Sequence, residues 1–79
     1  MPIASEPRVE VTIDNAQSFG KNRQRANEEF ERVYVTHMLK RHGGNVSSAA
    51  REGHMDRKHF HDICKKHGIT RAKLLGDEE

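Results

Sequence analysis

The strongest constraint on the fold of this 79-residue chain is a series of helix-starting and helix-ending residues in the stretch "GGNVSSAAREGHMDRKHFHDICKKHG". Gly43 and Gly44 end the segment that precedes them, because glycine adopts left-handed backbone angles without steric cost. Asn45 and Asp56 each stand where a side chain can cap the first turn of a new helix. These signals leave room only for two short helices joined by a tight turn.

We predict the first short helix over residues 46–52 and the second over residues 57–67. Ala49 and Ala50 in the first helix suit a close crossing by another helix, since a larger side chain would hold the two backbones apart. Gly68 follows the second helix as its C-terminal cap. The pattern is typical of a helix-turn-helix arrangement.

The second short helix is predicted to have one narrow apolar side. Phe60, Ile63 and Cys64 form a stripe that we expect to face inward. The remaining side chains are polar and expected to face outward; they are Arg57, Lys58, His59, His61, Asp62, Lys65 and Lys66. A helix of this composition would have most of its surface free to meet a partner.

A longer helix is predicted upstream, over about residues 23–42. Its main apolar stripe recurs at spacings of three and four residues and consists of Ala26, Phe30, Val33, Tyr34, His37 and Met38. Val35 and Leu39 form a second apolar seam, roughly half a turn away. We expect one seam to pack on the domain and the other on a second copy of the chain, with dimerisation through Phe30, Val35, Met38 and Leu39.

Charge is concentrated in the half of the chain that contains the short helices. Residues 37–71 hold eight Lys or Arg and three acidic residues, and all six histidines lie between positions 37 and 67. This segment has a formal charge of +5 within a chain whose net charge is +2. Such a field attracts polyanions.

Other kinds of site fit the sequence less well. His59, His61, Cys64 and His67 lie within nine residues, but their spacing matches no common structural zinc pattern, and Cys64 is expected inside. We see no nucleophile or carboxylate pair placed by a rigid cleft. We therefore expect no enzyme activity, catalytic residue, metal or cofactor.

Residues 30–69, "FERVYVTHMLKRHGGNVSSAAREGHMDRKHFHDICKKHGI", resemble the Fis-type helix-turn-helix at the C-terminus of NtrC-like activators of sigma-54 RNA polymerase. The matching signature is "GN" at 44–45, "AA" at 49–50, "DR" at 56–57 and the closing "KKHGI". The resemblance implies an all-α, three-helix domain that dimerises through its long first helix. It also implies that the third helix enters the major groove of double-stranded DNA.

The resemblance further implies a domain order and a set of partners. We expect a linker over residues 1–20, the DNA-binding domain over 21–76, including a further helical turn at 70–75, and an acidic tail over 77–79. In a longer protein, an ATPase domain and sigma-54 RNA polymerase would be partners. The expected location is the bacterial cytoplasm, at the nucleoid.

Residue roles carried over by position make Arg57 the candidate for a direct base contact, since its guanidinium can bind guanine O6 and N7 together. His59 and His61 would face the groove, with Asp62 accepting from a cytosine amino group. Ser47 and Ser48 would contact phosphate. The full set of expected DNA contacts is Ser47, Ser48, Asp56, Arg57, Lys58, His59, His61, Asp62, Lys65 and Lys66.

One residue departs from the family pattern. His54 stands where the family places its turn glycine, so either His54 adopts a positive φ or the helix before it ends early at Gly53. Alternative functions are a stand-alone Fis-like architectural protein of the nucleoid, an RNA-binding domain, or a dimerisation module with weak DNA affinity.

Overall fold

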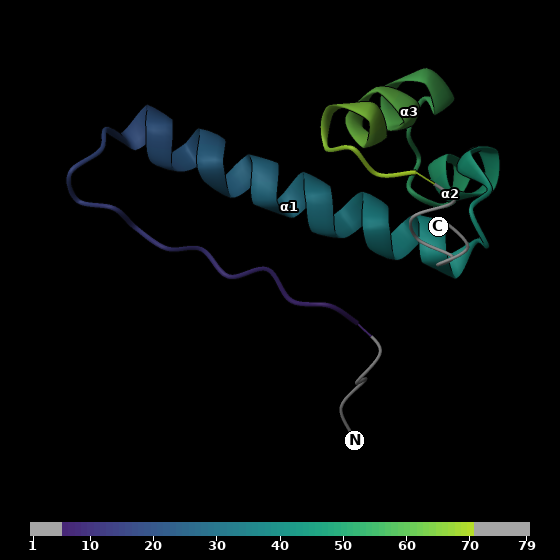
Figure 1. Cartoon of the computed structure of the whole chain (residues 1–79), viewed down its shortest axis with the longest axis horizontal. Coiled ribbons are helices and arrows are strands. Elements are labelled where there is room, and N and C mark those ends of the chain that lie inside the picture. The colour runs from purple at the N-terminus through teal and green to yellow at the C-terminus, as the bar shows by residue number, and fades with distance from the viewer. Residues whose placement is uncertain (1–5, 71–79) are drawn as a thin grey trace.

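The computed structural model describes residues 6–70, which contain three helices and no strand. They are α1 (Phe19–Arg41), α2 (Val46–Glu52) and α3 (Arg57–Lys66). The long α1 forms a rod, and α2 and α3 pack on one side of it, with α2 near its C-terminal end (Figure 1). The all-α, three-helix architecture predicted from the sequence is confirmed.

The two short helices have the predicted bounds, except that α3 ends at Lys66 with His67 as its cap. The start of α1 was predicted four residues too late. Ser18 caps this helix, since its hydroxyl oxygen accepts from the backbone N–H of Lys21 at 3.2 Å. The predicted boundary between linker and helix therefore moves toward the N-terminus.

All three helices end in the same hydrogen-bonded turn, the Schellman motif. In each, a residue with positive φ follows the cap, and the next N–H bonds back to a carbonyl in the last helical turn. These bonds join Gly44 to Leu39 at 2.8 Å, Met55 to Ala50 at 2.8 Å and Ile69 to Cys64 at 2.9 Å. The carbonyl groups left free at each helix end are thereby satisfied within the backbone.

His54 occupies the positive-φ position in the second of these turns. Its φ is +56°, whereas Gly53 before it has a φ of −83°. The first of the two alternatives for the turn is therefore correct. Gly53 matters for a different reason: a Cβ atom on it would lie 2.5 Å from the hydroxyl oxygen of Tyr34, so a side chain here would require the tyrosine to shift.

The core lies where the three helices meet. It contains eight buried residues: Val35, Met38 and Leu39 from α1, Ala49 and Ala50 from α2, and Phe60, Ile63 and Cys64 from α3. The two alanines allow α2 to approach its neighbours closely, as predicted. The ring of Phe60 is fully buried and lies at the centre of the packing.

The predicted assignment of the two apolar seams of α1 was wrong. Val35 and Leu39, expected on a separate surface for dimerisation, are 1% and 2% exposed and belong to the core of a single chain. Met38 is buried with them. Phe30, a member of the main stripe that was also expected to take part in dimerisation, is 52% exposed. The side of α1 that α2 and α3 cover is thus the one with Val35 and Leu39, which Met38 and Tyr34 of the main stripe also border.

Residues 6–17 form an irregular segment that runs back along α1, on the side away from α2 and α3 (Figure 1). The Thr12 carbonyl accepts a hydrogen bond from Arg25, and the backbone N–H of Asp14 donates to the Asn22 side chain at 2.8 Å. Residues 71–75 of the predicted extra turn and the acidic tail lie outside the described residues. None of the described helices has the length and apolar character needed to cross a membrane.

Candidate nucleic-acid interface

Helix α3 divides into a buried side and an exposed side as the sequence predicts. Phe60, Ile63 and Cys64 are its buried residues. The exposed residues are Arg57, Lys58, His59, His61, Asp62, Lys65 and Lys66. Because α1 and α2 cover mainly the apolar stripe, the polar side chains of α3 remain exposed, although Lys66 at its end contacts α1.

The first turns of α2 and α3 are capped differently. The Asn45 side chain accepts from the backbone N–H of Ser48 at 3.0 Å, which satisfies one free donor of α2. Asp56 occupies the predicted cap position of α3, but its side chain makes no capping hydrogen bond. Ser47 and Asp56 are exposed, and Ser48 is partly buried. Ser47 and Ser48 thus lie in the first turn of α2, and Asp56 directly precedes α3.

The lysines of α3 differ in their partners. Lys58 and Asp62 lie one turn apart, 3.7 Å from each other, and both are well exposed, so this pair adds little to stability. Within the described part of the chain, Lys65 has no acidic side chain in ion-pair contact. Lys66 is 3.3 Å from Glu31 and 3.8 Å from Glu28, both on α1.

Two acidic residues that the sequence analysis did not single out link the helices. Glu31 of α1 contacts both Lys66 and His67, the latter at 3.2 Å. Glu52 of α2 contacts Arg41 at 3.0 Å and His42 at 2.6 Å. No local pattern indicates the Glu31 contacts, because 35 residues separate Glu31 from Lys66.

The electrostatic environment follows from these contacts. The hydrogen bond from His67, and then the contacts with Lys66, lower the pKa of Glu31 below its usual value. Hydrogen bonds from Arg41 and His42 likewise lower the pKa of Glu52. Burial raises the pKa of the Cys64 thiol. Cys64 is thus a neutral core side chain.

The histidines and Cys64 are not brought together. His59 and His61 are exposed, whereas Cys64 is buried in the core. Among residues 6–70 there is no group of three His, Cys, Asp or Glu side chains placed to hold a metal ion. The donors considered from the sequence therefore do not form a site in the described structure.

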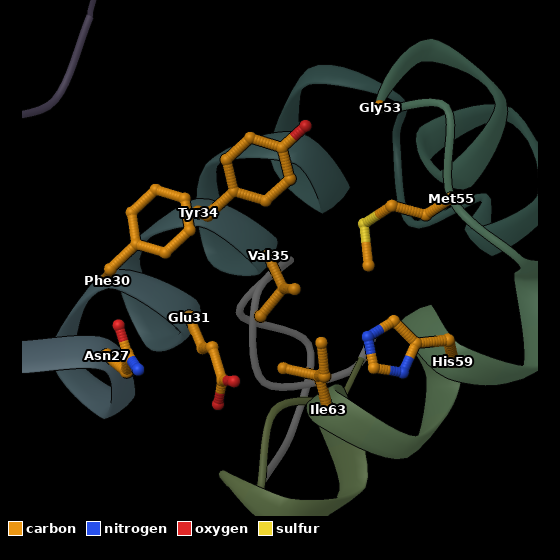
Figure 2. Close-up of a pocket in the computed structure, with 9 residues that line it drawn as sticks. All are labelled: Asn27, Phe30, Glu31, Tyr34, Val35, Gly53, Met55, His59 and Ile63. Carbon is orange, nitrogen blue, oxygen red and sulfur yellow. The ribbon is translucent and has the colours of Figure 1, made fainter. Parts of the chain in front are cut away.

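A mostly apolar hollow of about 430 Å³ lies between α1 and the helix-turn-helix. Figure 2 shows its walls: Phe30 and Tyr34 come from α1, Met55 from the turn, and His59 and Ile63 from α3. His59 therefore lies on the flank of α3 that is turned toward α1. The other histidine, His61, is not among the residues around this hollow.

Comparison with protein families matches residues 27–57 to the family described as "Bacterial regulatory protein, Fis family". The matched stretch runs from the middle of α1 through α2 to the first residue of α3. No curated protein and no solved structure gave a significant match. Over part of α1, the whole of α2 and the turn up to the start of α3, the chain is thus similar to the Fis family of bacterial regulatory proteins, and this similarity indicates binding to double-stranded DNA.

Proposed function

We propose that this chain binds specific DNA sequences by placing α3 in the major groove. The observation that carries the proposal is the exposed polar surface of α3 within a helix-turn-helix similar to the Fis family. A helix with its side chains is about 10–12 Å wide, and the major groove of B-form DNA is about 12 Å wide. The dimensions and the charge of α3 both suit this groove.

Arg57 is the residue that we assign to base recognition. It is the first residue of α3, and its side chain is exposed. In helix-turn-helix proteins the N-terminal residues of the recognition helix contact base edges. The guanidinium group can donate two parallel hydrogen bonds to guanine, which discriminates against the other bases.

The surrounding residues would position the helix or add contacts. Ser47, Ser48 and Lys65 are assigned to phosphate, since hydroxyl, backbone and ammonium donors fix the register on the duplex. The remaining members of the proposed interface are Asp56, Lys58, His59, His61 and Asp62. Of these, Asp62 can accept from a cytosine amino group.

We further propose that the chain acts as a homodimer on a two-fold-related site, as the DNA-binding part of a sigma-54-dependent activator. What supports the dimer is α1, whose apolar residues Phe30 and Val33 lie outside the core. In that setting an ATPase domain and sigma-54 RNA polymerase would be further partners.

The test of the DNA-binding proposal starts with selection of bound duplexes from a random pool. Arg57→Ala should then weaken binding to the selected sequence by about 1–3 kcal/mol and relax specificity at one base pair. Arg32→Ala is the matched control, because Arg32 pairs with Glu29 on α1, 2.6 Å away, and takes no part in α3. Equal losses on selected and random duplexes would contradict the assigned role of Arg57.

A further inference from the structure

We propose that Glu31 is a positioning residue that holds Lys66 against α1 and so withholds this lysine from DNA phosphate. The inference rests on the proposed DNA binding and revises one member of the interface expected from the sequence. Lys65 and Lys66 are adjacent and chemically identical, yet the structure gives them different surroundings. Of these two lysines, only Lys65 would then contribute to the electrostatic attraction of DNA.

Lys66 lies beside two carboxylates of α1. Its ammonium nitrogen lies 3.3 Å from a carboxylate oxygen of Glu31 and 3.8 Å from one of Glu28. Two carboxylates on successive turns of α1 thus oppose a single positive charge. Bringing a phosphate to Lys66 would place a third negative group beside them, and like charges at this range repel.

The position of Lys66 on α3 also turns it toward α1. Residues seven apart lie on the same side of a helix, about two turns from each other. His59 and Lys66 are such a pair, and His59 lines the hollow against α1 (Figure 2). Lys58 and Lys65 form the neighbouring pair, rotated by about 100° from the first. The side of α3 that carries Lys66 is therefore turned toward α1.

His67, the cap residue of α3, also contacts Glu31. Its ring nitrogen lies 3.2 Å from the same Glu31 oxygen that contacts Lys66, and the His67 side chain is only 13% exposed. Glu31 thus joins the end of α3 to the middle of α1. A carboxylate that fixes the end of the recognition helix favours one orientation of α3 in the groove, at the loss of one phosphate contact.

The experiment measures the salt dependence of DNA binding by the whole chain, on a selected duplex and on a random duplex of equal length. Each phosphate contact contributes about 0.9 to the slope of log affinity against log salt concentration. Lys65→Gln should lower that slope by about 0.9, whereas Lys66→Gln should leave it unchanged. Glu31→Gln removes the nearer of the two carboxylates beside Lys66, and it should increase the slope by up to about 0.9 and raise affinity for random DNA several-fold.

Glu29→Gln is the matched control for the charge change. Glu29 is also on α1, but it pairs with Arg32 within the same helix. The double variant Glu31→Gln/Lys66→Gln should bind like Lys66→Gln, because the effect of the first change acts through the lysine. Circular dichroism and thermal unfolding of each variant show whether the fold is kept, and the Lys66→Gln result alone decides the question if Glu31→Gln does not fold.

Two results would overturn the inference while leaving DNA binding in place. One is a Lys66→Gln slope as reduced as that of Lys65→Gln. The other is a Glu31→Gln variant that binds DNA like Glu29→Gln. A wild-type chain that binds neither duplex would instead overturn the proposed function, and the inference would fall with it.

Discussion

Gly53 and His54 are adjacent in the turn between α2 and α3, yet the structure places opposite requirements on them. Gly53 has an ordinary negative φ, but its missing side chain leaves space for the Tyr34 hydroxyl. His54 has a positive φ that favours glycine, and its side chain is exposed. By backbone angles alone, glycine would suit position 54 better than position 53. The Tyr34 hydroxyl is what disfavours a side chain at position 53.

Opposite changes in stability are therefore expected at these two positions. Gly53→Ala should lower the free energy of unfolding by about 1–3 kcal/mol, because the new methyl group overlaps the Tyr34 hydroxyl. His54→Gly should raise it by about 0.5–1 kcal/mol, since left-handed backbone angles are unfavourable for residues with a Cβ. Urea denaturation of both variants measures the two changes.

Tyr34→Phe provides the control for the first change. Removing the hydroxyl takes away the atom nearest to the added methyl group, so Gly53→Ala should cost less in the Tyr34→Phe background than in the wild type. An equal loss in both backgrounds would show that the turn, rather than the tyrosine, excludes a side chain at position 53.

At the scale of the helices, α1 differs from its neighbours in carrying apolar residues on two sides. One side enters the core through Val35, Met38 and Leu39. The other carries Phe30, whose ring contacts that of Tyr34 in a tilted arrangement with ring centres 5.5 Å apart and remains largely exposed. The irregular segment of residues 6–9 borders this second side without covering Phe30.

Phe30→Glu should weaken self-association, because it introduces a charge into the proposed contact between two copies of α1. Sedimentation velocity over a range of concentrations measures this effect. Val11→Glu is the control, since Val11 is similarly exposed but lies outside α1. Sedimentation unchanged by Phe30→Glu would refute this face as the dimer surface. Leu39→Glu is unsuitable for the same purpose, because Leu39 is a core residue whose replacement would unfold the chain.

The sequence predicted the bounds of the two short helices closely but not the buried side of α1, and the difference has a physical reason. The bounds of α2 and α3 follow from local chemistry: Asn45 caps one helix, Asp56 precedes the other and Gly68 ends it. The inward stripe of α3 was likewise readable, since Phe60, Ile63 and Cys64 are its only apolar residues. In α1 both stripes were plausible, and only the docking of α2 and α3 decides which one is buried.

At the scale of the whole molecule, two carboxylates bridge the helices at separate places. Glu31 connects α1 to Lys66 and His67 at the end of α3, and Glu52 connects α2 to Arg41 and His42 at the end of α1. These contacts were not predictable from the sequence, because they join residues at least ten positions apart. Glu31 thereby ties the end of α3 to α1, whereas Glu52 ties α2 to the end of α1.

Acid should weaken these bridges. The pKa values of Glu31 and Glu52 are both lowered in the folded chain from an ordinary value of 4.5. Their contribution to stability is therefore fully present above pH 4.5 and is lost as the pH falls through the lower, folded-state pKa values. We expect the thermal midpoint of the wild type to fall more steeply between pH 5 and about 3 than that of Glu31→Gln/Glu52→Gln. Parallel curves for the two proteins would contradict a role for these carboxylates.

The repeated Schellman turn has a consequence for how such a domain can change. Backbone hydrogen bonds end each helix, and Ala49, Ala50 and Gly53 leave room for close packing, so the path of the chain does not depend on the exposed side chains at positions 58, 61, 62 and 65. These four residues can be substituted together, for example in a library of variants, while the three helices keep their arrangement. Variants that prefer different DNA sequences could then be selected without a change in the fold.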